Sequence, residues 1–178
     1  MSKVQQILDA VEIERILKRM ACEILEVHKE TRDLALIGIH TRGVYLARRI
    51  RDHIKAFEQA ELATGEIDIT LYRDDWTQLS AQPVVKTTDI PFSVDDRQIL
   101  LVDDVLFTGR TIRAAMDAII DFGRPARIEL AVLIDRGHRE LPIQSNYTGH
   151  HVHTRPSDMI NVLLKESDGR DQVVLETQ

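Results

Sequence analysis

The sequence predicts an α/β fold in which a central, mainly parallel sheet is flanked by helices. Three runs of residues, 34–39, 99–102 and 128–134, are rich in apolar side chains, as in strands that are covered on both faces. Segments in which apolar residues recur at helical spacing separate these runs, and such alternation is typical of parallel sheets. The 178 residues, 43% of them hydrophobic, are enough for a single domain, 1–178, with its own core.

The first third of the chain is predicted to form a helix, a strand and a second helix. Asp9 and Glu12 have the spacing of a capping box, so the first helix should span about residues 10–29. The strand 34–39 follows, and a polar turn at 40–43 leads into the second helix. The apolar residues expected on one side of that helix are Ala47, Ile50, Ile54 and Phe57.

The rest of the chain adds strands, one helix and a lid. Residues 67–72 alternate apolar and polar side chains, which predicts a half-buried strand. Residues 73–98 contain few apolar positions and are expected to form a flexible hood over a binding site before strand 99–102 begins. The remaining expected elements are a helix with an apolar stripe of Ile112, Ala115, Met116, Ile119 and Ile120, the strand 128–134, and a C-terminal hairpin of strands 162–164 and 173–175.

Composition indicates a cytoplasmic protein. The single cysteine, Cys22, cannot form an internal disulfide and is expected to lie in the core along the first helix. No apolar run approaches the length that spans a bilayer, so no membrane contact is expected. The net charge of −6 argues against nonspecific adhesion to nucleic acid, although Lys18 and Arg19 form a local basic pair.

Three polar turns follow the predicted parallel strands, at residues 40–43, 103–110 and 135–139. In parallel α/β sheets, ligands bind beyond the carboxyl ends of the strands. We therefore expect these turns to converge and to form the functional site.

The turn at 108–111 has the residue types of a phosphate site. A helix begins there, and its free backbone N–H groups, its dipole and two threonine hydroxyls suit a phosphate dianion, while Gly109 permits close approach of the backbone. Asp103 and Asp104 cannot bind phosphate, so they are expected to accept hydrogen bonds from adjacent ribose hydroxyls. Together these features predict a ribose 5-phosphate site. The competing interpretation is an acidic loop that only caps a helix.

Two other nucleotide-binding motifs are missing from the sequence. It contains no GxxxxGK[ST], so the acids are not expected to belong to a P-loop nucleoside triphosphatase. It also contains no GxGxxG, which argues against a dinucleotide-binding fold.

The segment Val102-Asp-Asp-Val-Leu-Phe-Thr-Gly-Arg-Thr111 resembles the phosphoribosyl diphosphate (PRPP) motif of type I phosphoribosyltransferases. Two further segments resemble one branch of them, the bifunctional pyrimidine operon attenuation regulators that are also uracil phosphoribosyltransferases. These segments are Asp68-Ile-Thr-Leu-Tyr-Arg-Asp-Asp75 and Leu133-Ile-Asp-Arg-Gly-His-Arg-Glu-Leu-Pro-Ile143. The resemblance covers residues 7–143 well and is weaker beyond them.

The resemblance implies a reaction and a set of residues. A nitrogen of uracil would displace pyrophosphate from the anomeric carbon of PRPP and give UMP, with Mg²⁺ as cofactor. Asp103, Asp104 and Arg42 are the implied catalytic residues, and Asp135 is implied to contact Mg²⁺ through water. The residues implied to bind PRPP are Thr41, Arg42, Gly43, Arg73, Asp103, Asp104, Val105, Leu106, Phe107, Thr108, Gly109, Arg110 and Thr111.

The base pocket is implied to contain Asp135, Arg136, His150, His151 and Val152. Phe107 stands where hypoxanthine-guanine enzymes typically have an aspartate, which argues against 6-oxopurine salvage. The sequence departs from the regulator family at 144–154, where His150 and His153 replace a lysine and a proline, so the identity of the base and turnover stay open. His151 and His153 would share one face of a strand. A metal site there competes with a histidine-lined base or anion pocket and with an ordinary surface, and no cysteine or carboxylate at ligand spacing supports the metal.

The family's second function is nucleotide-dependent binding of pyrimidine operon mRNA, which attenuates transcription. An RNA-binding face shared between subunits would make the protein a homo-oligomer, a dimer or higher. Gln144 replaces an arginine of that face, and an ordinary solvated surface is the alternative interpretation. The residues implied to bind RNA are Lys18, Arg19, Thr41, His138 and Arg139.

The leading hypothesis is therefore a uracil phosphoribosyltransferase that also regulates transcription, with PRPP, uracil, uridine nucleotides and mRNA as ligands. Two alternatives are open. One is a salvage phosphoribosyltransferase for another base without RNA binding. The other is a regulator that senses PRPP or nucleotides and has lost catalysis.

Overall fold

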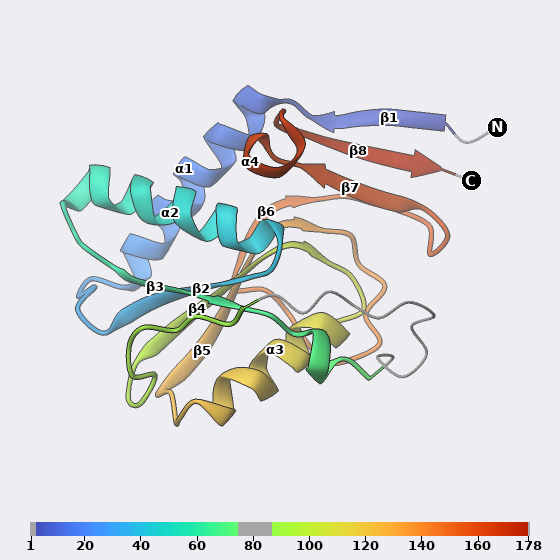
Figure 1. Ribbon diagram of the computed structural model, residues 1–178. Helices are drawn as coiled ribbons and strands as arrows, with labels where there is room; N and C mark the ends of the chain where they lie inside the picture. Colours follow the sequence, from blue (N-terminus) through green and yellow to red (C-terminus); the bar gives the residue numbers. More distant parts are fainter. Residues whose placement is uncertain (1–2, 75–86, 178) are drawn as a thin grey trace.

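The computed structural model describes residues 3–74 and 87–177 and contains a five-stranded, fully parallel sheet (Figure 1). The α/β architecture predicted from the sequence is confirmed. Each strand is hydrogen-bonded to the next in the spatial order β3-β2-β4-β5-β6. The strands are β3 (Ala63–Ile67), β2 (Leu34–Ile39), β4 (Gln98–Leu106), β5 (Arg127–Asp135) and β6 (Tyr147–His151).

Helices cover both faces of this sheet (Figure 1). Helices α1 (Ala10–Val27) and α2 (Arg42–Glu58) lie on one face, and α3 (Arg110–Asp121) lies on the other. The core is accordingly divided into two clusters of buried side chains, one under α1 and α2 and one under α3. All six residues of β2 are buried, as its continuous apolar sequence predicts.

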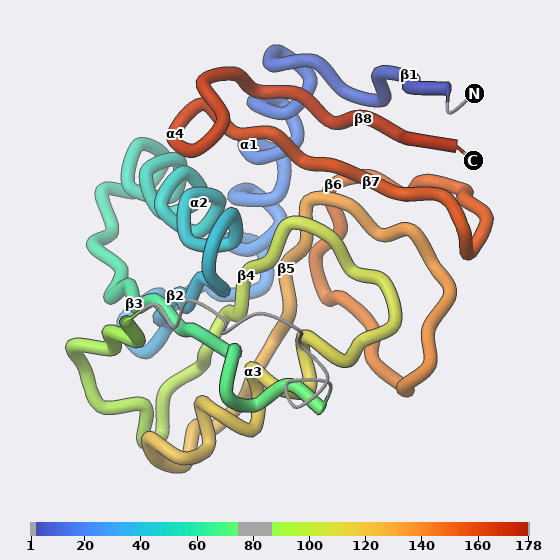
Figure 2. Tube along the Cα trace, turned by 45° about the vertical axis from the view of Figure 1, so that its right-hand side comes forward, coloured from blue at the N-terminus to red at the C-terminus, as the bar shows by residue number. Residues whose placement is uncertain are grey.

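A second, antiparallel sheet of three strands carries both ends of the described chain (Figures 1 and 2). In the order β1-β8-β7 it contains β1 (Lys3–Leu8), β8 (Gln172–Thr177) and β7 (Met159–Leu163). The predicted C-terminal hairpin is confirmed, with Val162 opposite Val173, and its turn contains the short helix α4 (Lys165–Asp168). Strand β1 was not predicted from the sequence, because three of its six residues are polar and they do not alternate regularly with the apolar ones.

The first two helices begin as expected, and several side chains differ from the prediction. The capping box of Asp9 and Glu12 is present, with mutual hydrogen bonds of 2.8 and 2.9 Å. Helix α1 ends at Val27. The next residue, His28, is buried, and its Nε2 lies 2.5 Å from Oε2 of Glu129 on β5. Cys22 is exposed rather than in the core, because it lies on the outer side of the helix. Phe57 and Ile120, expected in apolar stripes, are also exposed.

The strand predicted at 67–72 is wrong. Strand β3 ends at Ile67, and a 3-10 turn, η1 (Thr70–Tyr72), follows. The side chain of Asp68 causes the break, because its Oδ1 accepts hydrogen bonds from both the backbone N (2.9 Å) and the hydroxyl (2.6 Å) of Thr70. This local bonding replaces a strand ladder.

Part of the predicted hood, 75–86, lies outside the described residues, and Asp75 is among them. The described part after it is packed on the domain: Asp89 forms a β-bridge with Glu66, and Val94 is fully buried in the cluster under α3. Within the described residues, the helices are too short or too polar to cross a membrane.

Two glycines bring helix α2 unusually close to the sheet. A Cβ atom at Gly38 on β2 would lie 2.4 Å from Cα of Val44, and one at Gly43 would lie 2.4 Å from the carbonyl oxygen of Val102 on β4. Backbone atoms occupy both places, so no side-chain rotation could make room. The first turn of α2 is therefore held directly against the end of β2 and the middle of β4.

We expect Gly38→Ala to lower the free energy of unfolding by about 3 kcal/mol or more, because overpacking against backbone cannot be relieved locally. Urea denaturation followed by circular dichroism measures the loss. Gly169→Ala is the matched control, since Gly169 has a φ of 75° but nothing within 4 Å of its Cβ position. Gly169→Ala should lower the free energy of unfolding by about 1–2 kcal/mol, because alanine is placed in a left-handed conformation but meets no other atom. Equal losses in the two variants would contradict the close approach of α2.

Candidate functional site

The three polar turns predicted to form the site do converge at the carboxyl ends of β2, β4 and β5. The backbone N of Arg136 donates to the carbonyl of Leu106 at 3.1 Å, and Nη1 of Arg139 donates to the carbonyl of Phe107 at 2.9 Å. The turn after β2 meets β4 at Gly43. Adjacent parallel strands bring these segments together although they are far apart in the sequence.

A cavity of about 370 Å³, here called the sheet-edge cavity, lies where the turn after β2 meets β4 and the start of α3. Seven of the residues assigned to PRPP from the sequence line it: Thr41, Arg42, Arg73, Asp103, Asp104, Val105 and Thr111. The sequence analysis did not assign five other lining residues, which are Ile39, His40, Asp68, Ile69 and Thr70. The Asp68–Thr70 turn that ends β3 brings the last three to the cavity.

Asp103 and Asp104 lie inside β4 rather than after a strand end, because β4 continues to Leu106. Asp103 is only 6% exposed, and its Oδ1 accepts the backbone N–H of Asp104 at 2.9 Å. Burial, and then the charge of Asp104, raises the pKa of Asp103 well above its ordinary value. Burial also raises the pKa of Asp104, although the nearby Arg42 guanidinium opposes the shift. Ionising either of these two carboxyl groups at the cavity wall therefore costs free energy.

The loop before α2 contributes Thr41 and Arg42. The peptide bond between His40 and Thr41 is cis. Arg42, the first residue of α2, pairs through its guanidinium with Asp168 of the C-terminal turn, with 3.0 Å between Nη2 and Oδ1. This partner was not found from the sequence, because 126 residues separate the two.

The turn at 108–111 opens α3 as predicted. Gly109 is the N-cap residue with a φ of 91°, a conformation that favours glycine. The carbonyl of Thr108 accepts the backbone N–H groups of Glu140 (2.9 Å) and Leu141 (3.1 Å), which fixes the turn on the connection after β5. Arg110 points to carboxylates, with 2.6 Å to both Asp74 and Glu140. Asp74 lies at the root of the predicted hood.

A second cavity of about 460 Å³, here called the β6 cavity, lies beside the end of β6. Four of the five residues assigned to the base pocket line it: Asp135, Arg136, His151 and Val152. His150, the fifth, is not among the residues that line it. The other lining residues are Gly137, Arg139, Gln144, Ser145, Thr148 and His153.

Phe107 lies between Arg136 and His138. The guanidinium of Arg136 is 4.0 Å from the centre of the Phe107 ring, and the His138 ring meets Phe107 edge-on at 6.3 Å. Arg136 is buried, and its Nη2 donates to the carbonyl of Arg155 at 2.9 Å. The Arg136 guanidinium thus covers one face of the Phe107 ring.

Asp135 is held by its own loop. Nη2 of Arg139 lies 2.5 Å from Oδ2 of Asp135, and the backbone N–H of Gly137 donates to Oδ1 at 2.9 Å. Burial would raise the pKa of Asp135, but these hydrogen bonds outweigh it and the pKa lies below its ordinary value. Asp135 is therefore an ionised group whose two oxygens already have partners in the protein.

The residues assigned to RNA come from three places. Lys18 and Arg19 lie on α1, where Arg19 also donates to the carbonyl of Gly149 on β6 at 2.5 Å. Arg139 donates to Asp135 and to three backbone carbonyls, so its guanidinium holds the loop after β5. His138, next to it, reaches the carbonyl of Thr154 at 2.7 Å. Thr41 lines the sheet-edge cavity.

The histidine segment does not form a single strand face. His151 is the last residue of β6, and His153 lies beyond it. The predicted sharing of one strand face is therefore wrong, because the strand ends first. Across the described ranges 3–74 and 87–177, no group of three or more histidine, cysteine, aspartate or glutamate residues could hold a metal ion.

Proteins of known family are similar to this chain over nearly its whole length. Residues 3–161 match the phosphoribosyl transferase domain family. "Bifunctional protein PyrR" of Desulfosudis oleivorans is 55% identical over 178 residues, which cover 99% of this chain and 98% of that protein. The protein of the same name from Thermus thermophilus is 54% identical over 170 residues, which cover 96% and 94%.

Solved structures support the fold. The hypoxanthine phosphoribosyltransferase of Trypanosoma cruzi superposes with a TM-score of 0.75 at 17% identity, over 97% of this chain and 91% of that one. A hypoxanthine phosphoribosyltransferase of Staphylococcus aureus gives a TM-score of 0.70 at 16% identity, over 96% and 90%. At this identity the similarity concerns the fold and not the base.

We expect Asp103→Asn to stabilise the protein near neutral pH. Because the folded-state pKa of Asp103 is raised, ionisation costs stability as the pH rises from the ordinary carboxyl value, about 3.9, through the folded-state pKa. Asparagine cannot ionise, and its amide oxygen can still accept the N–H of Asp104. The unfolding temperature should rise by about 2–4 °C, which corresponds to about 1 kcal/mol in a domain of this size.

Calorimetric scans across pH measure this effect. The gain should disappear at acidic pH, where the wild-type carboxyl is protonated in both states. Asp117→Asn, an exposed carboxylate on α3, is the control and should show no such gain. A loss of stability in Asp103→Asn at every pH would count against the buried, ionisable pair.

Proposed function

Because this chain belongs to the phosphoribosyl transferase family and, within it, to the bifunctional PyrR proteins, we propose that it transfers the phosphoribosyl group of PRPP to uracil and also regulates pyrimidine operon expression by binding mRNA. The observation that carries the catalytic part is the sheet-edge cavity. It combines the Asp103–Asp104 pair, Arg42 and Thr111 at the N-terminus of α3. These groups match the ribose hydroxyls, the pyrophosphate and the 5-phosphate of PRPP.

In the reaction, a nitrogen of uracil forms a bond to the anomeric carbon while the bond from that carbon to pyrophosphate breaks. The leaving group departs with the electron pair, and the transition state resembles an oxocarbenium ion. Asp103 and Asp104 orient the ribose and face the positive charge that develops on the ring. Arg42 faces the negative charge that develops on the pyrophosphate. Little proton transfer by the protein is needed.

Mg²⁺ fits this site as an ion that arrives with the substrate. Mg²⁺ is usually held by one or two carboxylates together with substrate phosphates, and Asp104 lines the cavity. Asp135 would contact the ion through water, as the family resemblance implies, while its two oxygens accept hydrogen bonds from Gly137 and Arg139. When bound, the ion neutralises charge on the pyrophosphate. The protein supplies the orientation of the ribose and the exclusion of water.

The base pocket supports uracil over a purine. Phe107 offers no carboxylate to an imidazole nitrogen of a purine, and Arg136 covers its ring. The β6 cavity lies beside this pair, with the side chains of His151 and His153 among its walls. We assign the base to the region of Phe107, Arg136 and the β6 cavity.

The RNA-binding part uses a basic face that includes Lys18, whose side chain is 54% exposed. Arg139 is proposed to support RNA binding indirectly. Its guanidinium donates to Asp135 and to the carbonyl of Phe107, so it holds the loop after β5 in place. A face shared between subunits of a homo-oligomer would extend the contact beyond a single chain.

We expect Asp104→Asn to reduce kcat/KM for UMP formation from uracil and PRPP with Mg²⁺ by about 10- to 100-fold. A charged hydrogen bond to the ribose is worth about 1.5–3 kcal/mol. Asp117→Asn should keep wild-type activity. Hypoxanthine and guanine serve as competing acceptors in the same assay. Turnover of another base in place of uracil would indicate a different salvage enzyme. PRPP binding without turnover of any base would indicate a regulator that has lost catalysis.

We expect Lys18→Ala to weaken binding of a pyrimidine operon RNA stem-loop and to reduce the slope of log K against log salt by about one. Lys55→Ala is the control, since that lysine on α2 is equally exposed, at 54%, but lies outside the proposed face. Filter binding over a range of salt concentrations measures both. Affinity that does not depend on salt would contradict the proposed face.

A further inference from the structure

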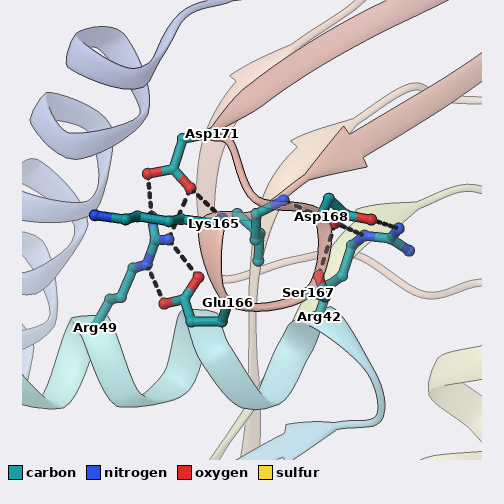
Figure 3. Close-up of polar contacts among 8 residues, drawn as sticks. Arg42, Arg49, Lys165, Glu166, Ser167, Asp168 and Asp171 are labelled. Atoms are coloured by element: carbon teal, nitrogen blue, oxygen red, sulfur yellow. Dashed lines mark hydrogen bonds and ion pairs between the residues drawn. The ribbon is translucent and has the colours of Figure 1, made fainter.

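The C-terminal turn between β7 and β8 is bound to the first half of helix α2 by ion pairs (Figure 3). Three carboxylates of the turn, those of Glu166, Asp168 and Asp171, meet two arginines of α2, Arg42 and Arg49. The sequence analysis assigned no function to this part of the chain, which lies beyond the segments 68–75, 102–111 and 133–143 that carry the family resemblance.

Arg49 anchors the turn. Its Nε and Nη2 lie 2.9 and 2.5 Å from the two oxygens of Glu166, and its Nη1 and Nη2 lie 3.0 and 2.7 Å from those of Asp171. The Arg49 side chain is only 17% exposed, so solvent weakens these contacts less than it weakens ordinary surface pairs. The position of the turn on α2 is therefore set independently of Arg42.

Asp168 is a rigid, ionised partner for Arg42. Its Oδ2 accepts hydrogen bonds from the backbone N of Leu164 (2.9 Å) and the hydroxyl of Ser167 (2.7 Å). These bonds and the Arg42 contact lower the pKa of Asp168 to about 2. The carboxylate thus has its charge at all physiological pH values and a single orientation, set by its own turn.

The contact uses only one edge of the Arg42 guanidinium. Nε lies 3.3 Å from Oδ2 of Asp168 and Nη2 lies 3.0 Å from Oδ1. A guanidinium has five N–H donors, so Nη1 and the second hydrogen of Nη2 are left as a fork that suits two phosphate oxygens. In Figure 3 the third guanidinium nitrogen points away from Asp168. Arg42 lines the sheet-edge cavity, and its charge acts on Asp104 there.

We propose that Asp168 is a positioning residue for phosphoribosyl transfer, which holds one edge of the Arg42 guanidinium so that the opposite edge faces the pyrophosphate of PRPP. The inference rests on the proposed function, because that function assigns pyrophosphate to Arg42. A long arginine side chain at the first turn of a helix has several rotamers, and fixing it before the substrate binds lowers the entropic cost of the contact. The second sheet, through its turn, would then be part of the catalytic machinery.

The test compares Asp168→Asn with Asp171→Asn, a matched pair in the same turn. Each removes one carboxylate charge and retains an oxygen that can accept the backbone N–H bound by the original side chain. Only Asp168 touches Arg42. We expect Asp168→Asn to weaken pyrophosphate binding, measured by calorimetry, and to lower kcat/KM for PRPP, each by about tenfold. Asp171→Asn should stay within about twofold of wild type in both, and unfolding midpoints of both variants check folding.

The same comparison in an Arg42→Gln background separates positioning from a general structural role. If Asp168 acts through Arg42, Asp168→Asn should cause no further loss once Arg42 is absent. An additive loss would overturn the proposal. Tighter pyrophosphate binding in Asp168→Asn would also overturn it, because Asp168 would then be a competitor for Arg42.

Failure of the proposed function gives a different result. Pyrophosphate binding needs neither uracil nor turnover, so the Asp168 effect is measurable even if wild-type protein forms no UMP. A wild-type protein that does not bind pyrophosphate would refute the role of Arg42 and with it this inference.

Discussion

The close approach of helix α2 to strands β2 and β4 is the constraint on which the site depends. At Gly38 and Gly43 no Cβ atom fits between the helix and the sheet, so backbone rests on backbone. This contact places Arg42 at the edge of the sheet beside Asp104 and directs the rest of α2 along the sheet. A larger side chain at either glycine would lift the helix and remove its cation from the cavity.

Acidic residues lie on two sides of Arg42. Asp103 and Asp104 lie in the wall of the cavity, where burial raises their pKa values and makes their ionisation costly. Arg42 opposes that cost from one side and is itself held by Asp168 from the other. The chain therefore accepts an electrostatic penalty at the place where ribose hydroxyls and pyrophosphate would be bound. Such penalties are typical of binding and catalytic sites.

The antiparallel sheet also contributes to this arrangement, because its hairpin turn is ion-paired with helix α2. Strand β1 from the beginning of the chain and the hairpin from its end form one sheet, and the hairpin turn meets α2 through Arg42 and Arg49. The loop after β5 is held by a separate arginine, Arg139, which joins Asp135 to the carbonyl of Phe107. Two arginine–aspartate pairs thus fix the two sides of the site.

The sequence by itself determined the parallel sheet, the order of its main elements and the PRPP motif, because buried strands are continuous apolar runs and a phosphate turn has a local composition. It misplaced the strand at 67–72, because a single side chain, Asp68, decided the local backbone through hydrogen bonds to Thr70. Local patterns also gave no sign of β1, of the exposure of Cys22 on α1, or of the absence of His150 from the lining of the β6 cavity. Only the tertiary structure decided the partners of Arg42 and Arg139. Ion pairs of this kind join residues whose sequence positions are unrelated, and their geometry exists only after the elements have packed.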